Sequence, residues 1–237
     1  MWSVDGGRNL NNYNDFINEL NKAGFSLAGG NDEGIYGIIK FSWNEEPDDS
    51  PIRWHTEDPE TDPWEWRMRV LEERDDIAYA KLFFNKGGFI TKELYPYFLA
   101  ARRGSKDFEE EYADGKISHF AKRIYEVVER SDSLALHEIK QQGMFTREDK
   151  SRFNSALTEL QMKMYITMCG RKNRFLGPGG QHWPSTVLCT TEKFFDEEVF
   201  RQAWSIDAKD AAEKIRLQIL KLNPEAKEKR IGRFIRG

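Results

Sequence analysis

Apolar residues recur every three or four positions in several stretches of the chain, and this is the period of an amphipathic α-helix. The first stretch covers residues 10–23, where an apolar stripe runs from Leu10 to Leu20 and Gly24 ends it. The same period predicts further helices over residues 117–130, 134–142, 146–161, 196–204 and 208–222. The pattern therefore predicts a mainly helical protein.

Shorter apolar segments indicate strands. Residues 35–43 carry the strongest β pattern of the N-terminal half, and Gly87 with Gly88 indicates a turn further on. In the C-terminal half, residues 163–170 and 186–191 predict the two strands of a hairpin, joined by a basic loop that contains glycine and proline. Residues 44–63 are acidic and hold four prolines, so we expect a long loop there.

A helix start is signalled where that loop ends. Asp62 is a good N-cap residue, Pro63 suits the first helical position, and Glu65 follows three residues after the cap. We therefore predict a helix over residues 63–74. Helical geometry turns Trp64 and Trp66 to different sides, roughly 200° apart. We expect each ring to pack against a different neighbour; the alternative, a ring that contacts a ligand, stays open.

Length and composition narrow the class of protein. The chain has 237 residues, enough for one large domain or two small ones, and it holds no apolar run of membrane-spanning length and no signal-peptide pattern. Two cysteines, Cys169 and Cys189, are too few for a disulfide framework or a cysteine-based zinc site. The four histidines lack metal-ligand spacing. We therefore expect a cytoplasmic protein without a membrane segment, metal or cofactor.

Charge divides the chain into two unlike halves. Residues 1–114 hold 24 acidic and 13 basic side chains, net −11, whereas residues 115–237 hold 16 acidic and 23 basic ones, net +7. An acidic half joined to a basic half indicates that the second half faces nucleic acid, although solvated charge clusters would give the same count. We expect an acidic N-terminal α/β subdomain over residues 1–114.

The order of elements in the basic half is that of a winged helix: helix, helix, turn, helix, then a hairpin with a basic tip. We predict a winged-helix region over residues 115–192 and C-terminal helices over residues 193–237 that pack on the core. In this fold the third helix usually enters the major groove of double-stranded DNA, and the wing touches the backbone or the minor groove.

The candidate DNA-binding residues follow from this order. Arg and Lys can pair with guanine edges or phosphates, and Asn can pair with adenine. The outward face of the third helix carries Arg147, Lys150, Ser151, Asn154, Ser155 and Thr158, and the wing carries Arg171, Lys172 and Arg174. The fold class expected is therefore α+β, predominantly helical, with a winged-helix region of the DNA-binding type.

Five segments carry a resemblance to a known family: "NKAGFSLAGG", "PWEWRMR", "AYAKLFF", "GGFITKELYPYFLAARR" and the predicted winged helix. Together they resemble the AlkZ-related proteins, bacterial relatives of the AlkZ/YcaQ winged-helix DNA glycosylases. The resemblance covers most of the chain and implies a winged-helix fold and DNA contact. It does not extend to the catalytic Gln-x-Gln or Gln-x-Asp signature of the glycosylases, because no such triplet occurs in this sequence.

Three functions are compatible with these observations. The leading hypothesis is a DNA-binding protein that uses the residues named above. The second is a DNA repair enzyme with divergent catalytic residues, whose site would lie in a cleft between the halves near residues 44–63. The third is a protein-interaction module in which the acidic half covers the basic half. The basic tail, residues 225–237, either tracks phosphates or forms a surface helix packed by its apolar residues.

Overall fold

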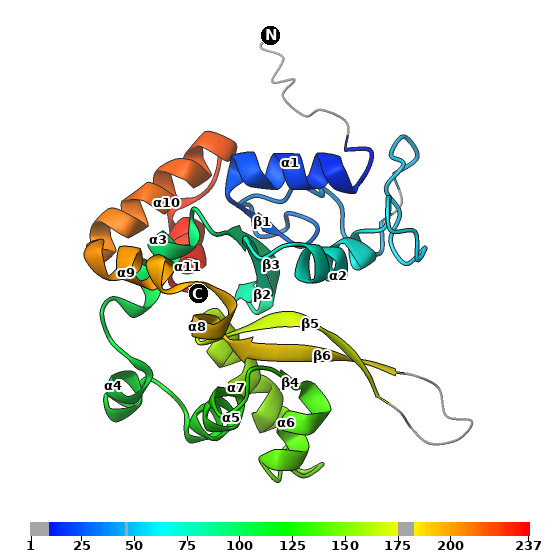
Figure 1. Cartoon of the computed structure of the whole chain (residues 1–237). Helices are drawn as coiled ribbons and strands as arrows, with labels where there is room; N and C mark the ends of the chain where they lie inside the picture. The colour runs from blue at the N-terminus through cyan, green and yellow to red at the C-terminus, as the bar shows by residue number, and fades with distance from the viewer. Residues whose placement is uncertain (1–9, 46, 175–182) are drawn as a thin grey trace.

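Strands from both halves of the chain form one sheet, flanked by two groups of helices (Figure 1). A computed structural model describes residues 10–45, 47–174 and 183–237, without the side chains of residues 173, 174 and 183. Among these residues six strands lie in the order β1-β3-β2-β5-β6-β4, and each pairing between them is antiparallel. The strands are β1 (Phe25–Leu27), β2 (Ile77–Phe83), β3 (Lys86–Thr91), β4 (Leu134–Ala135), β5 (Ile166–Arg174) and β6 (Trp183–Thr190).

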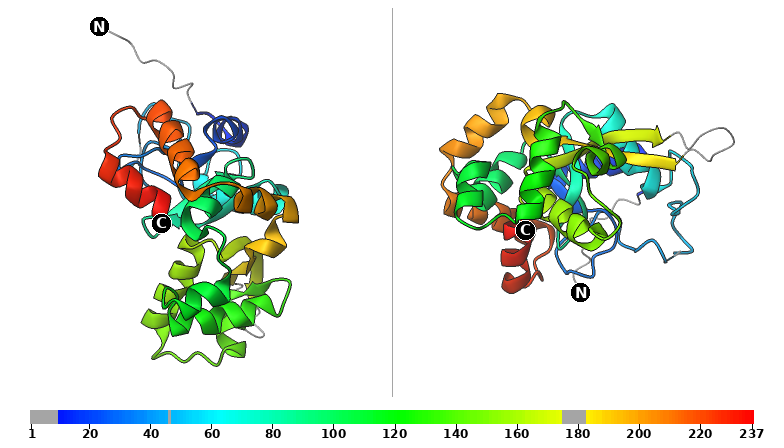
Figure 2. Two further views of the ribbon diagram at one scale, coloured as in Figure 1. Left: turned by 90° about the vertical axis from the view of Figure 1, so that its left-hand side faces the viewer. Right: turned by 90° about the horizontal axis from the view of Figure 1, so that it is seen from below.

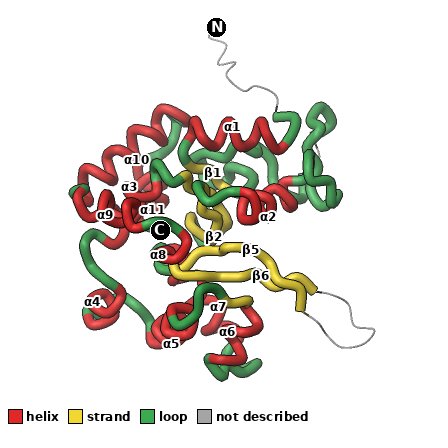
Figure 3. Tube along the Cα trace, viewed as in Figure 1, coloured by secondary structure: helices red, strands yellow, loops and turns green. Residues whose placement is uncertain are grey.

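The helices lie at both ends of this sheet, as Figure 3 shows. They are α1 (Tyr13–Ala23), α2 (Pro63–Glu73), α3 (Tyr95–Arg103), α4 (Phe108–Ala113), α5 (His119–Glu129), α6 (Leu136–Gln142), α7 (Lys150–Met162), α8 (Thr191–Phe194), α9 (Glu197–Ser205), α10 (Ala208–Leu222) and α11 (Glu228–Arg236). This mixture of helix and sheet confirms the expected α+β class. None of the described helices is long and apolar enough to cross a membrane.

Helix α2 begins where its cap predicts. The Asp62 carboxylate accepts the N–H of Trp64 at 2.8 Å, and Pro63 occupies the first turn. Trp66 is 0% exposed and stacks on Phe16 of α1 with ring centroids 5.2 Å apart, so the packing expectation is confirmed for this ring. Trp64 contacts a different neighbour, His55 of the acidic loop, with ring centroids 5.1 Å apart, but it stays 43% exposed.

The strand expected over residues 35–43 does not form. The segment makes one isolated bridge, between Gly37 and Leu27, and is otherwise irregular. Ile38 donates its N–H to the side chain of Ser26 at 3.0 Å, so this donor is taken by a hydroxyl and not by a neighbouring strand. Ile35, Ile38 and Ile39 are buried nonetheless, and the burial of these isoleucines produced the strand-like pattern.

The turn expected at Gly87 and Gly88 lies three residues earlier. Phe84 and Asn85 adopt φ values of 53° and 62°, and both glycines belong to strand β3. Gly88 is needed in the strand because a Cβ there would lie 2.4 Å from the ring of Phe83. The glycines therefore serve close packing between strands and not the turn.

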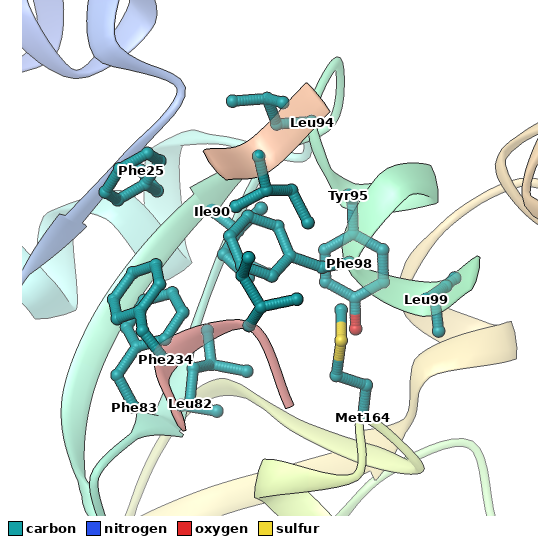
Figure 4. Packing of buried hydrophobic residues seen from close by; sticks show 14 of the residues in the cluster. Phe25, Leu82, Phe83, Ile90, Leu94, Tyr95, Phe98, Leu99, Met164 and Phe234 are labelled. Atoms are coloured by element: carbon teal, nitrogen blue, oxygen red, sulfur yellow. The ribbon is translucent and has the colours of Figure 1, made fainter. Parts of the chain in front are cut away.

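The C-terminal helices share one core with strands and a helix of the N-terminal half. Figure 2 (left) shows the N-terminal segment and the C-terminal helices together at one end of the molecule and α4–α7 at the other. Within the shared core, Phe234 of α11 stacks on Phe83 of β2 with centroids 3.9 Å apart and lies close to Phe25 and Phe98 (Figure 4). The tail is thus packed by its apolar residues, as the second of the two alternatives predicts.

Arg102 joins the parts of the molecule. Its guanidinium donates to four backbone carbonyls, at 2.7 to 3.0 Å, which belong to Leu82 of β2, Met162 of α7, and Phe234 and Ile235 of α11. Burial lowers the pKa of this guanidinium, and the four acceptors offset the loss of water around the charge. One side chain therefore ties the N-terminal sheet to α7 and to the C-terminal helix.

A separate group of buried side chains lies under α5, α6 and α7. It includes Ile124, Val128, Ile139, Phe153 and Leu160, with Leu188 from the sheet. The charged segment 104–115 contains helix α4, whose Phe108 stacks on Tyr125 with centroids 3.8 Å apart. Asp107 and Glu110 form a capping box at its start, which explains a helix in so charged a segment.

Candidate nucleic-acid interface

Helix α7 is held from beneath by apolar contacts and at its end by a hydrogen bond. Phe153, Ala156 and Leu160 are at most 2% exposed and face the core shared with α5. Near the C-terminal end, the buried side chain of Gln161 accepts the N–H of Lys81 on β2 at 3.0 Å. The helix therefore has a fixed orientation relative to the sheet.

The opposite face of α7 carries polar side chains. Lys150, Ser151, Asn154 and Ser155 are exposed, whereas Thr158 is half-buried. The Thr158 hydroxyl donates to the carbonyl of Asn154 at 2.9 Å, so it is engaged with its own helix. Of the expected residues, this face therefore presents one lysine, two serines and one asparagine freely to solvent.

Arg147 lies in a turn before the helix, because α7 begins at Lys150 and not at residue 146. Asp149 accepts hydrogen bonds from both the N–H and the hydroxyl of Thr146, at 2.9 and 3.1 Å, and this closes the turn. The N–H of Thr146 also holds the pKa of the Asp149 carboxyl below its usual range. Among the described residues neither Arg147 nor Lys150 makes an ion pair.

The basic residues of the expected wing belong to a strand. β5 continues to Arg174, so Arg171 and Lys172 lie within the hairpin ladder, opposite Thr186 and Ser185. Residues 171–174 were expected in the loop, but pairing with β6 places them in a strand. The side chain of Arg174 and the whole of residues 175–182 lie outside the described part of the chain.

Both described cations of the hairpin are paired with carboxylates from other elements. Arg171 lies 3.0 Å from Glu72 and 3.5 Å from Glu65, both on α2. Lys172 lies 2.5 Å from Glu138 on α6. The hydrogen bond from Lys172 is the main reason that the pKa of Glu138 is lowered, and the N–H of Ala135 adds to it. A phosphate would have to compete with these acids.

One exposed cation beside this face was missed. Arg152 places its guanidinium 4.9 Å from the ring centre of Phe120 on α5 and 3.5 Å from Asp149. It lies on the side of α7 that turns toward α5, so a face drawn along the Lys150 stripe left it out. Its 67% exposed side chain is nonetheless accessible. Phe120 and Arg152 are far apart in the sequence, so only the packing of α5 on α7 reveals their contact.

Metal-ligating side chains are dispersed through the described residues, where no three of His, Cys, Asp and Glu come together. The two cysteines lie on the paired strands β5 and β6, as expected. A hydrogen bond between their thiols lowers the pKa of Cys169 and raises that of Cys189.

Comparison with known proteins gives one family. The model of the family described as AlkZ related matches residues 10–236, which is nearly the whole chain. No curated protein and no solved structure matches the chain. The match extends from α1 to α11 and so includes the sheet, α7 and the hairpin. The chain belongs to the AlkZ-related family.

Proposed function

We propose that the chain binds double-stranded DNA through a winged-helix unit, with α7 as the helix that enters the major groove. The observation that carries this proposal is the exposed polar face of α7. It holds Lys150 and Asn154 outward on a helix whose opposite face is fully packed. Such side chains can read base edges, and neighbouring Arg147 can neutralise a phosphate.

The order and pairing of elements support a winged helix. The chain runs α5, β4, α6, α7, β5, β6, and the short strand β4 pairs with β6 while β6 pairs with β5. A three-helix unit followed by a hairpin is the arrangement in which a winged helix docks its third helix on DNA. The strand between the first two helices was not expected from the sequence and adds to this support.

Family membership supports DNA as the partner, because the resemblance noted above links these proteins to winged-helix DNA glycosylases. The Gln-x-Gln and Gln-x-Asp triplets are absent from the sequence, so we propose binding and not base release. We propose that the unit spans residues 115–192, between an acidic subdomain, residues 1–114, and C-terminal helices, residues 193–237. Helix α4 contributes Phe108 to the same core.

The proposal is tested by fluorescence anisotropy with a labelled duplex over a range of salt concentrations. We expect binding that weakens as salt rises, since phosphate contacts release counterions. Replacing both cations at the start of α7, R147Q with K150Q, should lower the steepness of log K against log salt by about 2. It should also weaken binding to all duplex sequences, because phosphate contacts carry no sequence information.

A matched double variant on the C-terminal helices serves as the control. Lys209 and Lys229 are also exposed, and K209Q with K229Q removes the same charge. This control should leave the salt dependence close to that of the unaltered chain. Absence of salt-dependent duplex binding at low salt, or equal weakening by both double variants, would overturn the proposal.

A further inference from the structure

A pocket of about 520 Å³ opens beside helix α2, at the edge of the long acidic loop. Its walls come from the N-terminal half: the segment between β1 and α2, the first two turns of α2, and strands β2 and β3. This volume is within the ~300–1,000 Å³ range of small-molecule sites. None of the DNA-binding residues proposed above lines it.

Flat aromatic rings form most of the apolar wall. Trp43 is 67% exposed and Trp64 is 43% exposed, and both line the pocket together with Trp54, Tyr79 and Phe89. Two exposed indoles at the mouth of one pocket are costly in water unless something covers them. Every nucleobase has a flat face that can stack on such rings.

The backbone that carries these rings is held firmly. The buried carboxylate of Asp62 accepts three N–H groups, from Thr56 at 2.8 Å, Glu57 at 3.0 Å and Trp64 at 2.8 Å. This carboxylate therefore fixes the loop and the helix start together. His55 is kept at φ 61°, in the left-handed region that non-glycine residues seldom adopt. Its ring lies 5.1 Å from that of Trp64 and 6.3 Å from that of Trp43.

Close backbone approach shapes the inner wall. The ring of Trp54 lies against Gly29, where an added Cβ would be 2.5 Å from the indole. Only glycine leaves room for the ring at this point, just after strand β1. The wall is therefore a built surface, with ring positions set by the fold and not by solvent.

Two cations line the same pocket. The guanidinium of Arg67 lies over Trp64, 3.2 Å from its ring centre, and its Nε donates to the Trp64 carbonyl at 3.1 Å. No carboxylate pairs with Arg67 among the described residues. Lys86, on the other side of the pocket, is 3.0 Å from Glu33. Polar groups of Asp32, Ser42 and Asn44 complete the lining.

We propose that this pocket binds an unpaired nucleotide. The base stacks on the indoles and on the Arg67 guanidinium, since Arg planes and aromatic rings both stack on bases. The phosphate lies with Arg67 and Lys86, and the polar side chains are available to the base edge. A cationic ligand would meet these two cations, and a purely apolar one would bury them without partners.

This inference stands apart from duplex binding by α7, because it uses different residues. The same chemistry is offered by a free mononucleotide and by an unpaired base in a single strand. Isothermal titration calorimetry with nucleoside 5′-monophosphates is compared with the nucleosides, with ribose 5-phosphate, and with a short single-stranded oligonucleotide. We expect nucleotides to bind more tightly than either the base-bearing or the phosphate-bearing fragment alone.

Two variants locate the binding. W64A should weaken nucleotide binding about tenfold or more, as loss of a stacking ring does in single-strand binders. The control W204A removes an indole that is 60% exposed on α9, outside the pocket, and should leave binding unchanged. R67Q should reduce the preference for nucleotide over nucleoside about fivefold, because it removes the unpaired cation. Melting curves confirm that each variant is folded.

Each outcome decides the question. Mononucleotide binding that W64A weakens assigns a free nucleotide to the pocket. Binding of the oligonucleotide alone, weakened by W64A, assigns an unpaired base of a strand. Failure of every ligand at millimolar concentration, or equal weakening by W64A and W204A, overturns the inference. Duplex anisotropy run in parallel separates this result from the proposed function, since W64A should not change it and R147Q with K150Q should not change nucleotide binding.

Discussion

Cations at the start of α7 and cations on the hairpin carry the same charge in very different surroundings. Lys150 and Arg147 are exposed and without ion pairs among the described residues, whereas Arg171 and Lys172 are held by acids of α2 and α6. The acids that pair with the hairpin cations come from both sides of the boundary predicted at residue 115: Glu65 and Glu72 precede it, and Glu138 follows it. Tertiary neighbours thus decide which of these equal charges is available.

Net charge counted from the sequence overstates the positive charge that the second half offers to a ligand. The basic second half has a net charge of +7 by sequence, yet part of this charge is satisfied by the acidic first half. The hypothesis that the acidic half covers the basic half therefore has a physical counterpart at the hairpin, whereas Arg147 and Lys150 have no acidic partner among the described residues. Exposed pairs of this kind contribute little to stability but do compete with a phosphate.

The largest effect is expected from a change that removes the buried packing that holds α7 on the core. F153A deletes a side chain that is 1% exposed, and we expect a loss of about 3–5 kcal/mol in the free energy of unfolding because a cavity remains. Urea denaturation measures it. S151A, on the exposed face of the same helix, should change stability by less than about 0.5 kcal/mol. Equal effects of the two changes would contradict the described packing.

The second-largest effect is on duplex binding, and it compares the unpaired cation Lys150 with the paired cation Lys172. K150Q should weaken duplex binding about five- to tenfold near 0.1 M salt, since it removes one free phosphate contact. K172Q should weaken it only about twofold, because Lys172 must first leave Glu138. Anisotropy titrations of both variants give the ratio. A larger effect at Lys172 would show that the hairpin pair opens readily on DNA.

A third change should raise the availability of a hairpin cation. E65Q with E72Q frees Arg171 from its acids on α2, and we expect duplex binding to strengthen about two- to threefold. E60Q with E73Q removes the same charge from the partners of Arg69 and serves as the control. If both double variants strengthen binding equally, general charge and not the Arg171 contact is responsible.

The smallest effect concerns pH. Lys172 lowers the pKa of Glu138 in the folded chain, so this pair stabilises the fold above the unfolded pKa of glutamate, about 4.3. The contribution is lost as the pH falls through the folded pKa of Glu138. We therefore expect K172M to lower Tm slightly at pH 7 and to match the unaltered chain near pH 3. K209M, on α10, should show no such convergence, and thermal melts at both pH values decide it.

Local signals in the sequence determined much of the fold. Asp62 with Pro63 fixed the start of α2, Gly24 ended α1, and Asp207 with Asn223 bounded α10, as the structure confirms. These features act through hydrogen bonds and backbone angles within a few residues, so they can be read without knowledge of neighbours. The order of the helices and the position of the hairpin followed from the spacing of apolar residues, which is also a local feature of the sequence.

Contacts between distant segments decided the rest. Burial without pairing gave residues 35–43 the pattern of a strand, and pairing with β6 extended β5 through a segment that reads as loop. The same holds for the sites: Trp64 is exposed because Trp66 takes the inner position on α2, and Arg171 is engaged because α2 lies beside β5. A sequence states which side chains carry charge and rings. Whether each is buried, paired or free depends on which remote segment packs beside it. Local propensity contains no information about which remote segments come together in space.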